Sequence, residues 1–124
     1  MQIYKTRQFD RWASKEGLTD QVLRSAVSEM ERGLIDADLG GHVVKKRVAL
    51  PGRGKSGGAR TLVAYQCGSR AFFVYGFAKN ERDNIDAREL NVLKHLASIQ
   101  LGLSEAELLY ALTEGKLMEV YGDD

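Results

Sequence analysis

The chain is poor in the residues that mark several classes of protein. Among its 124 residues there is one cysteine, Cys67, and there are two histidines that stand far apart, His42 and His95. A lone cysteine excludes a disulfide framework, and the spacing of the histidines does not support a zinc site. No apolar run approaches the roughly 18 residues that span a bilayer, and the N-terminus lacks the apolar stretch of a secretory signal. We therefore predict a cytoplasmic protein without a membrane segment, a metal site or a small-molecule cofactor.

Acidic residues are missing from one third of the chain. Residues 39–80 contain eight lysines and arginines but no aspartate or glutamate, although the formal net charge of the whole chain is only +1. The flanking segments carry the compensating negative charge and so conceal this strongly basic middle third. If folding gathers the segment into one sheet, its surface attracts polyanions through electrostatic steering and counterion release. We expect nucleic acid to be the partner.

The spacing of apolar residues predicts the fold. The length and the 44% hydrophobic content suit one domain over residues 1–124. Helical periodicity follows a short candidate strand at residues 2–5, first up to Gly17 and then from Thr19 to Gly33. Capping boxes at Asp86 and Ser104 indicate two further helices, and residues 117–121 a short last strand.

In the basic third the apolar period becomes two. This period predicts antiparallel strands over residues 43–50, 60–67 and 71–78, with a two-residue turn at 68–69. The last of these strands is apolar at nearly every position, which indicates a central strand covered on both faces. We expect an α+β domain, a small, mainly antiparallel sheet with helices packed on one face.

Alternation along the strands sorts the cations. Lys45 and Arg47 share one face of their strand, whereas Lys46 points the other way with Val44 and Val48. Antiparallel pairing can bring further cations to the face of Lys45 and Arg47. The group that we expect on one concave face is Lys45, Arg47, Arg60, Lys79 and Arg82.

Such a group suits cleavage of RNA without a metal. When the 2′-hydroxyl attacks the adjacent phosphorus, negative charge accumulates on the phosphoryl oxygens, where fixed arginines and lysines stabilise it. A lysine crowded by other cations releases its proton more readily and can serve as the general base. The alternative is that these residues only bind phosphates.

The loop at residues 51–58 contains Gly-Lys-Ser but is not a nucleotide-binding loop. Ala49 stands where that motif has its first glycine, and a strand follows instead of a helix. Arg53 and Lys55 either contact an RNA backbone or belong to a solvated hairpin connection. We add Lys46 as a further RNA contact, and Tyr75 as one that stacks on a base or is packed with only its hydroxyl in water.

Several segments resemble a known family. They are FDRWASKEGL at 9–18, ERGLIDADLGG at 31–41, VVKKRVALPGRGKSGGARTLVAY at 43–65 and FFVYGFAKNERDNI at 72–85. Together with the order of elements, they resemble RelE-type toxins of the RelE/ParE superfamily, from bacterial type II toxin-antitoxin systems. The resemblance implies a small ribonuclease that cleaves mRNA, typically on the ribosome, inhibits translation and is held inactive by a cognate antitoxin.

The resemblance also assigns roles. Lys45 and Arg47 resemble the paired basic positions of the second strand, and Arg60 resembles the arginine that contacts the scissile phosphate. Lys79 and Arg82 lie in the basic turn after the fourth strand of that pattern. The chain departs from the family pattern at two positions, with Asn80 in place of an arginine and Asp86 in place of a tyrosine. The identities of the general acid and base therefore stay open.

Two rival functions fit the same sequence. A ParE-like toxin shares the fold but acts by binding DNA gyrase, and the abundance of phosphate-directed cations favours RNA over that protein target only modestly. A non-catalytic RNA-binding module would use the same cations without cutting. The products separate the three, since only a ribonuclease leaves cleaved transcripts.

Overall fold

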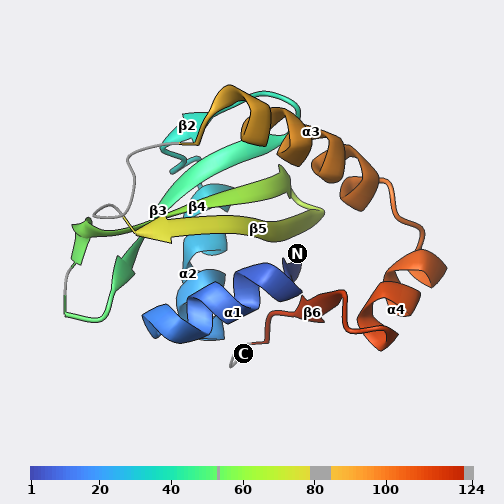
Figure 1. Ribbon diagram of the computed structural model, residues 1–124, viewed down its shortest axis with the longest axis horizontal. Helices are drawn as coiled ribbons and strands as arrows, with labels where there is room; N and C mark the ends of the chain where they lie inside the picture. Colours follow the sequence, from blue (N-terminus) through green and yellow to red (C-terminus); the bar gives the residue numbers. More distant parts are fainter. Residues whose placement is uncertain (53, 79–84, 122–124) are drawn as a thin grey trace.

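The computed structural model describes residues 1–52, 54–78 and 85–121, with residues 54–57 described by their backbone alone. In chain order the elements are β1 (Gln2–Thr6), α1 (Arg7–Glu16), α2 (Asp20–Glu31), β2 (Ala37–Asp38), β3 (Val43–Leu50), β4 (Gly54–Gln66), β5 (Arg70–Ala78), α3 (Ala87–Leu101), α4 (Glu105–Thr113) and β6 (Leu117–Glu119). Figure 1 shows this arrangement. Within the described ranges, none of the helices is long and apolar enough to cross a membrane. The expected α+β class is confirmed.

Polar caps explain where the first two helices begin. The side chains of Thr6 and Thr19 accept hydrogen bonds from the backbone N–H groups of Phe9 and Val22, which have no partner inside the helix. Helix α1 ends at Gly17, whose φ of 76° is the left-handed conformation that glycine adopts without strain. The hydrogen bond from Val22 to Thr19 confirms the predicted N-cap at Thr19.

The two predicted capping boxes are also present. The Asp86 carboxylate accepts from the backbone of Glu89, and the Glu89 carboxylate accepts from the backbone of Asp86. Ser104 and Glu107 make the same reciprocal pair at the start of α4. Each box satisfies two donors at the helix start, so these short polar motifs fix the first residues of α3 and α4.

The sheet has the order β2-β3-β4-β5-β1-β6. Neighbouring strands are antiparallel except β1 and β5, which are parallel. Strand β5 lies between β4 and β1, as its continuous apolar sequence predicts. The β4–β5 turn differs from the prediction, because it has three residues, 67–69, and the Ser69 N–H donates to the Gln66 carbonyl at 3.0 Å.

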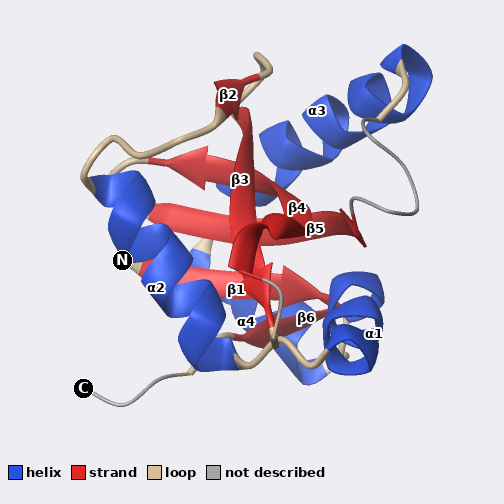
Figure 2. Ribbon diagram, turned by 90° about the vertical axis from the view of Figure 1, so that its left-hand side faces the viewer, coloured by secondary structure: helices blue, strands red, loops and turns tan. Residues whose placement is uncertain are grey.

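The helices cover both faces of the sheet, and the prediction of one covered face is wrong. Apolar residues occupy both alternating sets of strand positions, so each face has its own core. Val44, Val48 and Phe73 pack with α1 and α2, whereas Val43 and Leu62 pack with α3. Figures 1 and 2 show α2 and α3 on opposite sides of the strands. On the face that α3 covers, β3 changes from apolar at Val43 to basic at Lys45 and Arg47.

Candidate nucleic-acid interface

Three of the predicted cations lie together on one face of β3 and β4. Arg47 is directly opposite Arg60 in the antiparallel register, and Lys45 is opposite Leu62, two positions further along. Directly opposed side chains project from the same face with Cβ atoms about 5 Å apart, and diagonal neighbours lie about 7–8 Å apart. The sequence prediction that folding brings Arg60 close to Lys45 and Arg47 is confirmed. We call Lys45, Arg47 and Arg60 the cationic face.

Two aromatic side chains continue these rows onto β5. Phe77 is opposite Arg60, and Tyr75 is opposite Leu62. The rings of Tyr75 and Phe77 have centroids 6.0 Å apart with an interplanar angle of 48°. Phe77 is buried, whereas Tyr75 is partly exposed. Tyr75 therefore lies diagonally beside Arg60, within reach of a nucleotide bound there.

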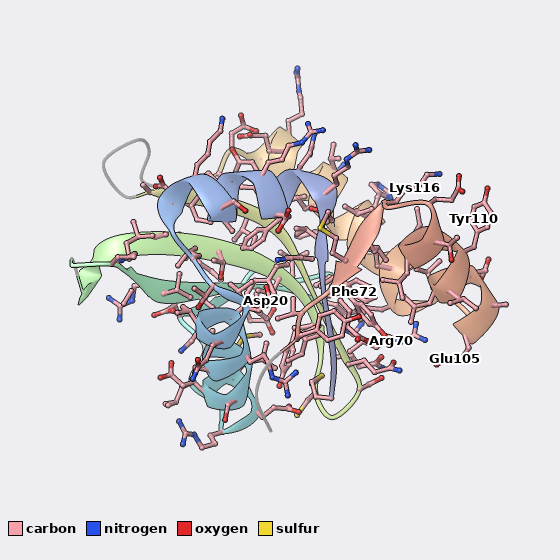
Figure 3. All side chains as sticks on the ribbon, turned by 90° about the horizontal axis from the view of Figure 1, so that it is seen from below. Asp20, Arg70, Phe72, Glu105, Tyr110 and Lys116 are labelled. Atoms are coloured by element: carbon pink, nitrogen blue, oxygen red, sulfur yellow. The ribbon has the colours of Figure 1, made fainter. Side chains whose placement is uncertain are left out.

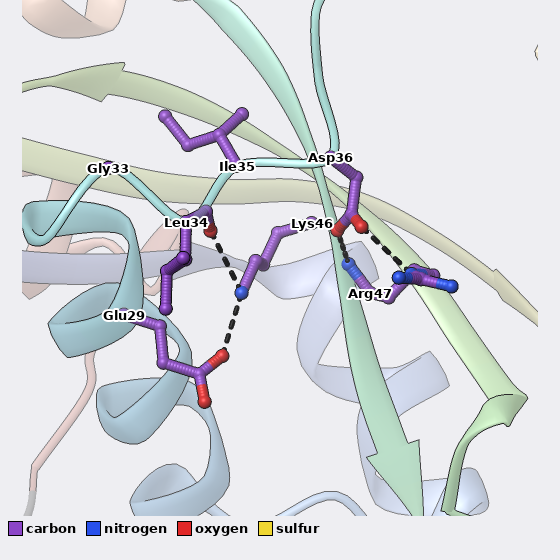
Figure 4. Close-up of a pocket in the computed structure, with 7 residues that line it drawn as sticks. All are labelled: Glu29, Gly33, Leu34, Ile35, Asp36, Lys46 and Arg47. Carbon is purple, nitrogen blue, oxygen red and sulfur yellow. Dashed lines mark hydrogen bonds and ion pairs between the residues drawn. The ribbon is translucent and has the colours of Figure 1, made fainter.

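Asp36 holds Arg47 in place. Its carboxylate accepts from the backbone N–H of Arg47 at 2.6 Å and from Nε at 2.8 Å (Figure 4). Partial burial of Asp36 favours its neutral form, but these two hydrogen bonds and the positive charge of Arg47 outweigh that effect and lower the pKa of the carboxyl. The Arg47 side chain keeps 47% of its surface in solvent. Asp36 thus fixes one edge of the guanidinium and leaves the rest able to meet an anion.

The guanidinium of Arg60 has a buried donor without a partner in the described ranges. Its Nη1 is buried and has no hydrogen-bond acceptor among the described residues. A buried guanidinium nitrogen without an acceptor costs free energy, about 1–3 kcal/mol for an ordinary polar group and more for a charged one. A phosphate oxygen is an acceptor that a guanidinium binds well. This donor is the strongest sign of a ligand on the cationic face.

The prediction of Lys46 as an RNA contact is wrong. Its side chain is only 6% exposed and packs under α2, where Nζ lies 2.7 Å from Glu29 Oε1 and donates to the Leu34 carbonyl at 2.9 Å. Figure 4 shows both contacts, with the Lys46 side chain pointing toward Glu29 and away from Arg47. Because strand positions alternate, Lys46 faces the core that the sheet forms with α1 and α2, while Lys45 and Arg47 face the side that α3 covers. Lys46 ties α2 to β3 and is not available to RNA.

Arg70, another cation of the basic third, also lies away from the cationic face. It is buried, its Nη1 donates to the Leu103 carbonyl at 2.6 Å, and its Nη2 lies 3.2 Å from Glu105 Oε1. Figure 3 shows Arg70 near Glu105 of α4. Arg70 therefore anchors the connection between α3 and α4 to β5. The positive charge of residues 39–80 does not collect on a single surface, because Lys46 and Arg70 are used inside the fold.

Several predicted site residues lie outside the residues that the structure describes. Arg53, Lys79 and Arg82 are outside the described residues, as is Asn80, and the Lys55 side chain is too. Asp86 is described, and its carboxylate caps α3. A residue that the sequence reasoning missed is Asp36, because its contact with Arg47 spans 11 residues and depends on how the chain enters β2.

A known protein family matches almost the whole chain. The model of a protein family described as the RelE toxin of the RelE / RelB toxin-antitoxin system matches residues 1–120. No curated protein matches the chain. The matched range contains the whole sheet and every residue of the cationic face.

Proposed function

The chain belongs to the RelE family of toxins, which act within toxin-antitoxin systems, and we propose that it is a metal-independent endoribonuclease that cleaves mRNA on the ribosome. Cleavage of cellular mRNA inhibits translation and accounts for toxicity. The partners in this proposal are mRNA, the ribosome and the cognate antitoxin. The observation that carries it is the buried Nη1 of Arg60, which has no acceptor in the described parts of the chain and lies directly across the ladder from Arg47.

The geometry supports a simple mechanism. The 2′-oxygen of one nucleotide forms a bond to the adjacent phosphorus while the bond from phosphorus to the 5′-oxygen breaks. The products are a 2′,3′-cyclic phosphate and a 5′-hydroxyl. Arg60 and Arg47 stabilise the charge that grows on the phosphoryl oxygens, and because this charge is larger in the transition state than in the substrate, their binding accelerates the reaction.

Lys45 and Tyr75 have further roles in this proposal. Lys45 lies on the same face, two positions from Arg47, and adds positive charge along the path of the RNA backbone. Tyr75 offers a ring beside Arg60 on which a base can stack. Lys79 and Arg82 lie outside the described residues and stay predicted members of the catalytic set, and a lysine among these cations can serve as the general base.

The test is to map RNA ends after induction. The chain is expressed from a tightly controlled promoter, alone and together with its antitoxin, and transcript ends are sequenced. We expect cleaved mRNA with 2′,3′-cyclic phosphate ends, and protection of the mRNA by the antitoxin. Growth arrest with intact mRNA and a DNA-damage response would overturn the proposal and indicate the gyrase-directed alternative.

A matched pair of variants locates the activity. Arg60→Ala should abolish most cleavage, since loss of one transition-state contact typically costs about 10²–10³ in rate. Arg11→Ala removes the same charge from an exposed position in α1 and should leave cleavage unchanged. Equal activity of the two variants would show that the cationic face is not the site.

A further inference from the structure

A hollow of about 320 Å³ lies between β5 and the first turns of α3. Its lining combines apolar side chains, one aromatic ring and two charged groups, namely Tyr75, Ile85, Arg88, Glu89, Val92 and Leu93. A concave, mainly apolar site with a few polar groups is the usual form of a small-ligand pocket, and this volume is at the lower end of their range of about 300–1,000 Å³. The hollow is outside the residues that the proposed mechanism uses for the phosphate.

Tyr75 connects the hollow with the cationic face. This residue lines the hollow and is also the diagonal neighbour of Arg60, because Arg60 pairs with Phe77 and Leu62 pairs with Tyr75. Diagonal neighbours in an antiparallel ladder lie about 7–8 Å apart. A phosphate held by Arg60 therefore places the base of the same or the next nucleotide at the mouth of the hollow.

We propose that this hollow binds an unpaired nucleobase next to the scissile phosphate and so sets the base preference of cleavage. The inference rests on the proposed function, because it takes the RNA chain as bound on the cationic face. A base has two flat apolar faces and a polar edge. The Tyr75 ring and the apolar wall of Val92 and Leu93 suit the faces, and Arg88 lies where it can donate to the edge.

The occupant is a base and not a peptide side chain for two reasons. The adjoining surface carries Lys45, Arg47 and Arg60, which attract a phosphate chain. A base that leaves its stack exposes aromatic surface to water, and stacking against Tyr75 removes that surface again. Recognition of splayed, unstacked bases is the usual way in which proteins read single-stranded RNA.

Two neighbouring positions in α3 give a matched test. Val92 lines the hollow and is 61% exposed, so Val92→Asp places a carboxylate in the wall without disturbing the core. Asn91→Asp adds the same charge one residue earlier, at an exposed position that does not line the hollow. Both proteins, and the unaltered chain, are added to a translating cell extract, and the cut sites and cleavage rates are measured.

We expect Val92→Asp to cut about tenfold more slowly, which is within the range for loss of one base-stacking contact, and to lose the base preference at the cleavage site. Asn91→Asp should retain the preference. Tyr75→Leu provides a second variant, with the same expected loss. If both hollow variants fold and cut the same sites at the same relative frequencies, the inference is wrong while the ribonuclease proposal stands. If the unaltered chain cuts no RNA, both are overturned.

Discussion

Lys45 and Lys46 follow one another in β3, yet their side chains lie on opposite faces of the sheet. Lys45 belongs to the cationic face, whereas Lys46 is buried beneath α2 and paired with Glu29 at 2.7 Å. The alternation of a strand produces this difference from two identical side chains. We propose that Lys45 binds RNA, whereas Lys46 stabilises the fold, and experiment can separate these two roles.

The first prediction compares Lys45→Met with Lys46→Met. Lys46→Met removes the contacts of Lys46 with the Glu29 carboxylate and the Leu34 carbonyl, so we expect it to lower the free energy of unfolding by about 1–3 kcal/mol. The loss stays below that of a fully buried pair because Glu29 is 25% exposed. Lys45→Met should leave stability within about 0.5 kcal/mol, as for other surface changes.

RNA binding should respond in the opposite order. Lys45→Met removes a proposed phosphate contact and should weaken binding and lower its dependence on salt, whereas folded Lys46→Met should bind as the unaltered chain does. Urea unfolding and binding titrations at several salt concentrations measure the two effects. A loss of binding in Lys46→Met without a loss of stability would contradict the assignment.

The second prediction concerns the double variant Lys45→Ala with Arg60→Ala. We expect it to abolish toxicity while its melting temperature stays near that of the unaltered chain, because the two side chains carry like charges and Arg60 Nη1 has no acceptor among the described residues. Growth after induction and thermal melting provide the measurements. A large fall in melting temperature would mean that these cations hold the fold together.

The third prediction concerns pH. The pKa of Asp36 is lowered in the folded protein, so its ionised form contributes stability above the ordinary aspartate pKa of about 3.9 and loses that contribution as pH falls through the lower folded-state pKa. Asp36→Asn should therefore be less stable by about 1 kcal/mol at neutral pH, the contribution of a partly exposed charged hydrogen bond. Denaturant unfolding from neutral pH to about pH 3 should show the difference shrink. A difference that stays constant would exclude a role for the charge.

The fourth prediction tests how α1 meets the sheet. A Cβ atom added at Gly76 would lie 2.2 Å from Cζ3 of Trp12, so the indole packs directly on the backbone of β5. Gly76→Ala should destabilise the protein by about 1–3 kcal/mol through overpacking. In the presence of Trp12→Leu, which makes room, the same change should cost less. Additive effects in this double-mutant cycle would show that the two residues are not in contact.

Much of this structure could be predicted from local patterns. The capping boxes at Asp86 and Ser104 fix helix starts because their partners are three residues away, and the apolar run of β5 indicates an interior strand because it lacks a polar face. Antiparallel pairing of adjacent strands predicts that Arg60 lies near Arg47, but not their exact register, and β4 begins at Gly54 instead of the predicted residue 60. In each case the decisive contact is local or belongs to adjacent strands.

The remainder depends on tertiary contacts that no local pattern contains. Strand alternation places Lys46 on the opposite face from Lys45 and Arg47, but its burial also requires α2 to pack so that Glu29 contacts Lys46. Asp36 reaches Arg47 only because β2 pairs with β3, and β2 is two residues long. The core beneath α3 was not predicted, because the apolar residues of α3 do not indicate which face of the sheet the helix covers.

The last prediction concerns the antitoxin. Among the residues that the structure describes, Arg47 is the one cation of the cationic face with a carboxylate partner, so we expect the antitoxin to bring carboxylates to Lys45 and Arg60 and to cover residues 42–60. Strand β2 pairs with β3 only at Val44 and Lys45, which leaves the outer edge of β3 beyond them without a strand partner in the described chain. Hydrogen exchange at that edge should slow when the antitoxin binds, and exchange in α4 should not. High salt should weaken the complex because exposed charge pairs are screened. Unchanged exchange throughout residues 42–60 in a saturated complex would mean that the antitoxin acts from another surface.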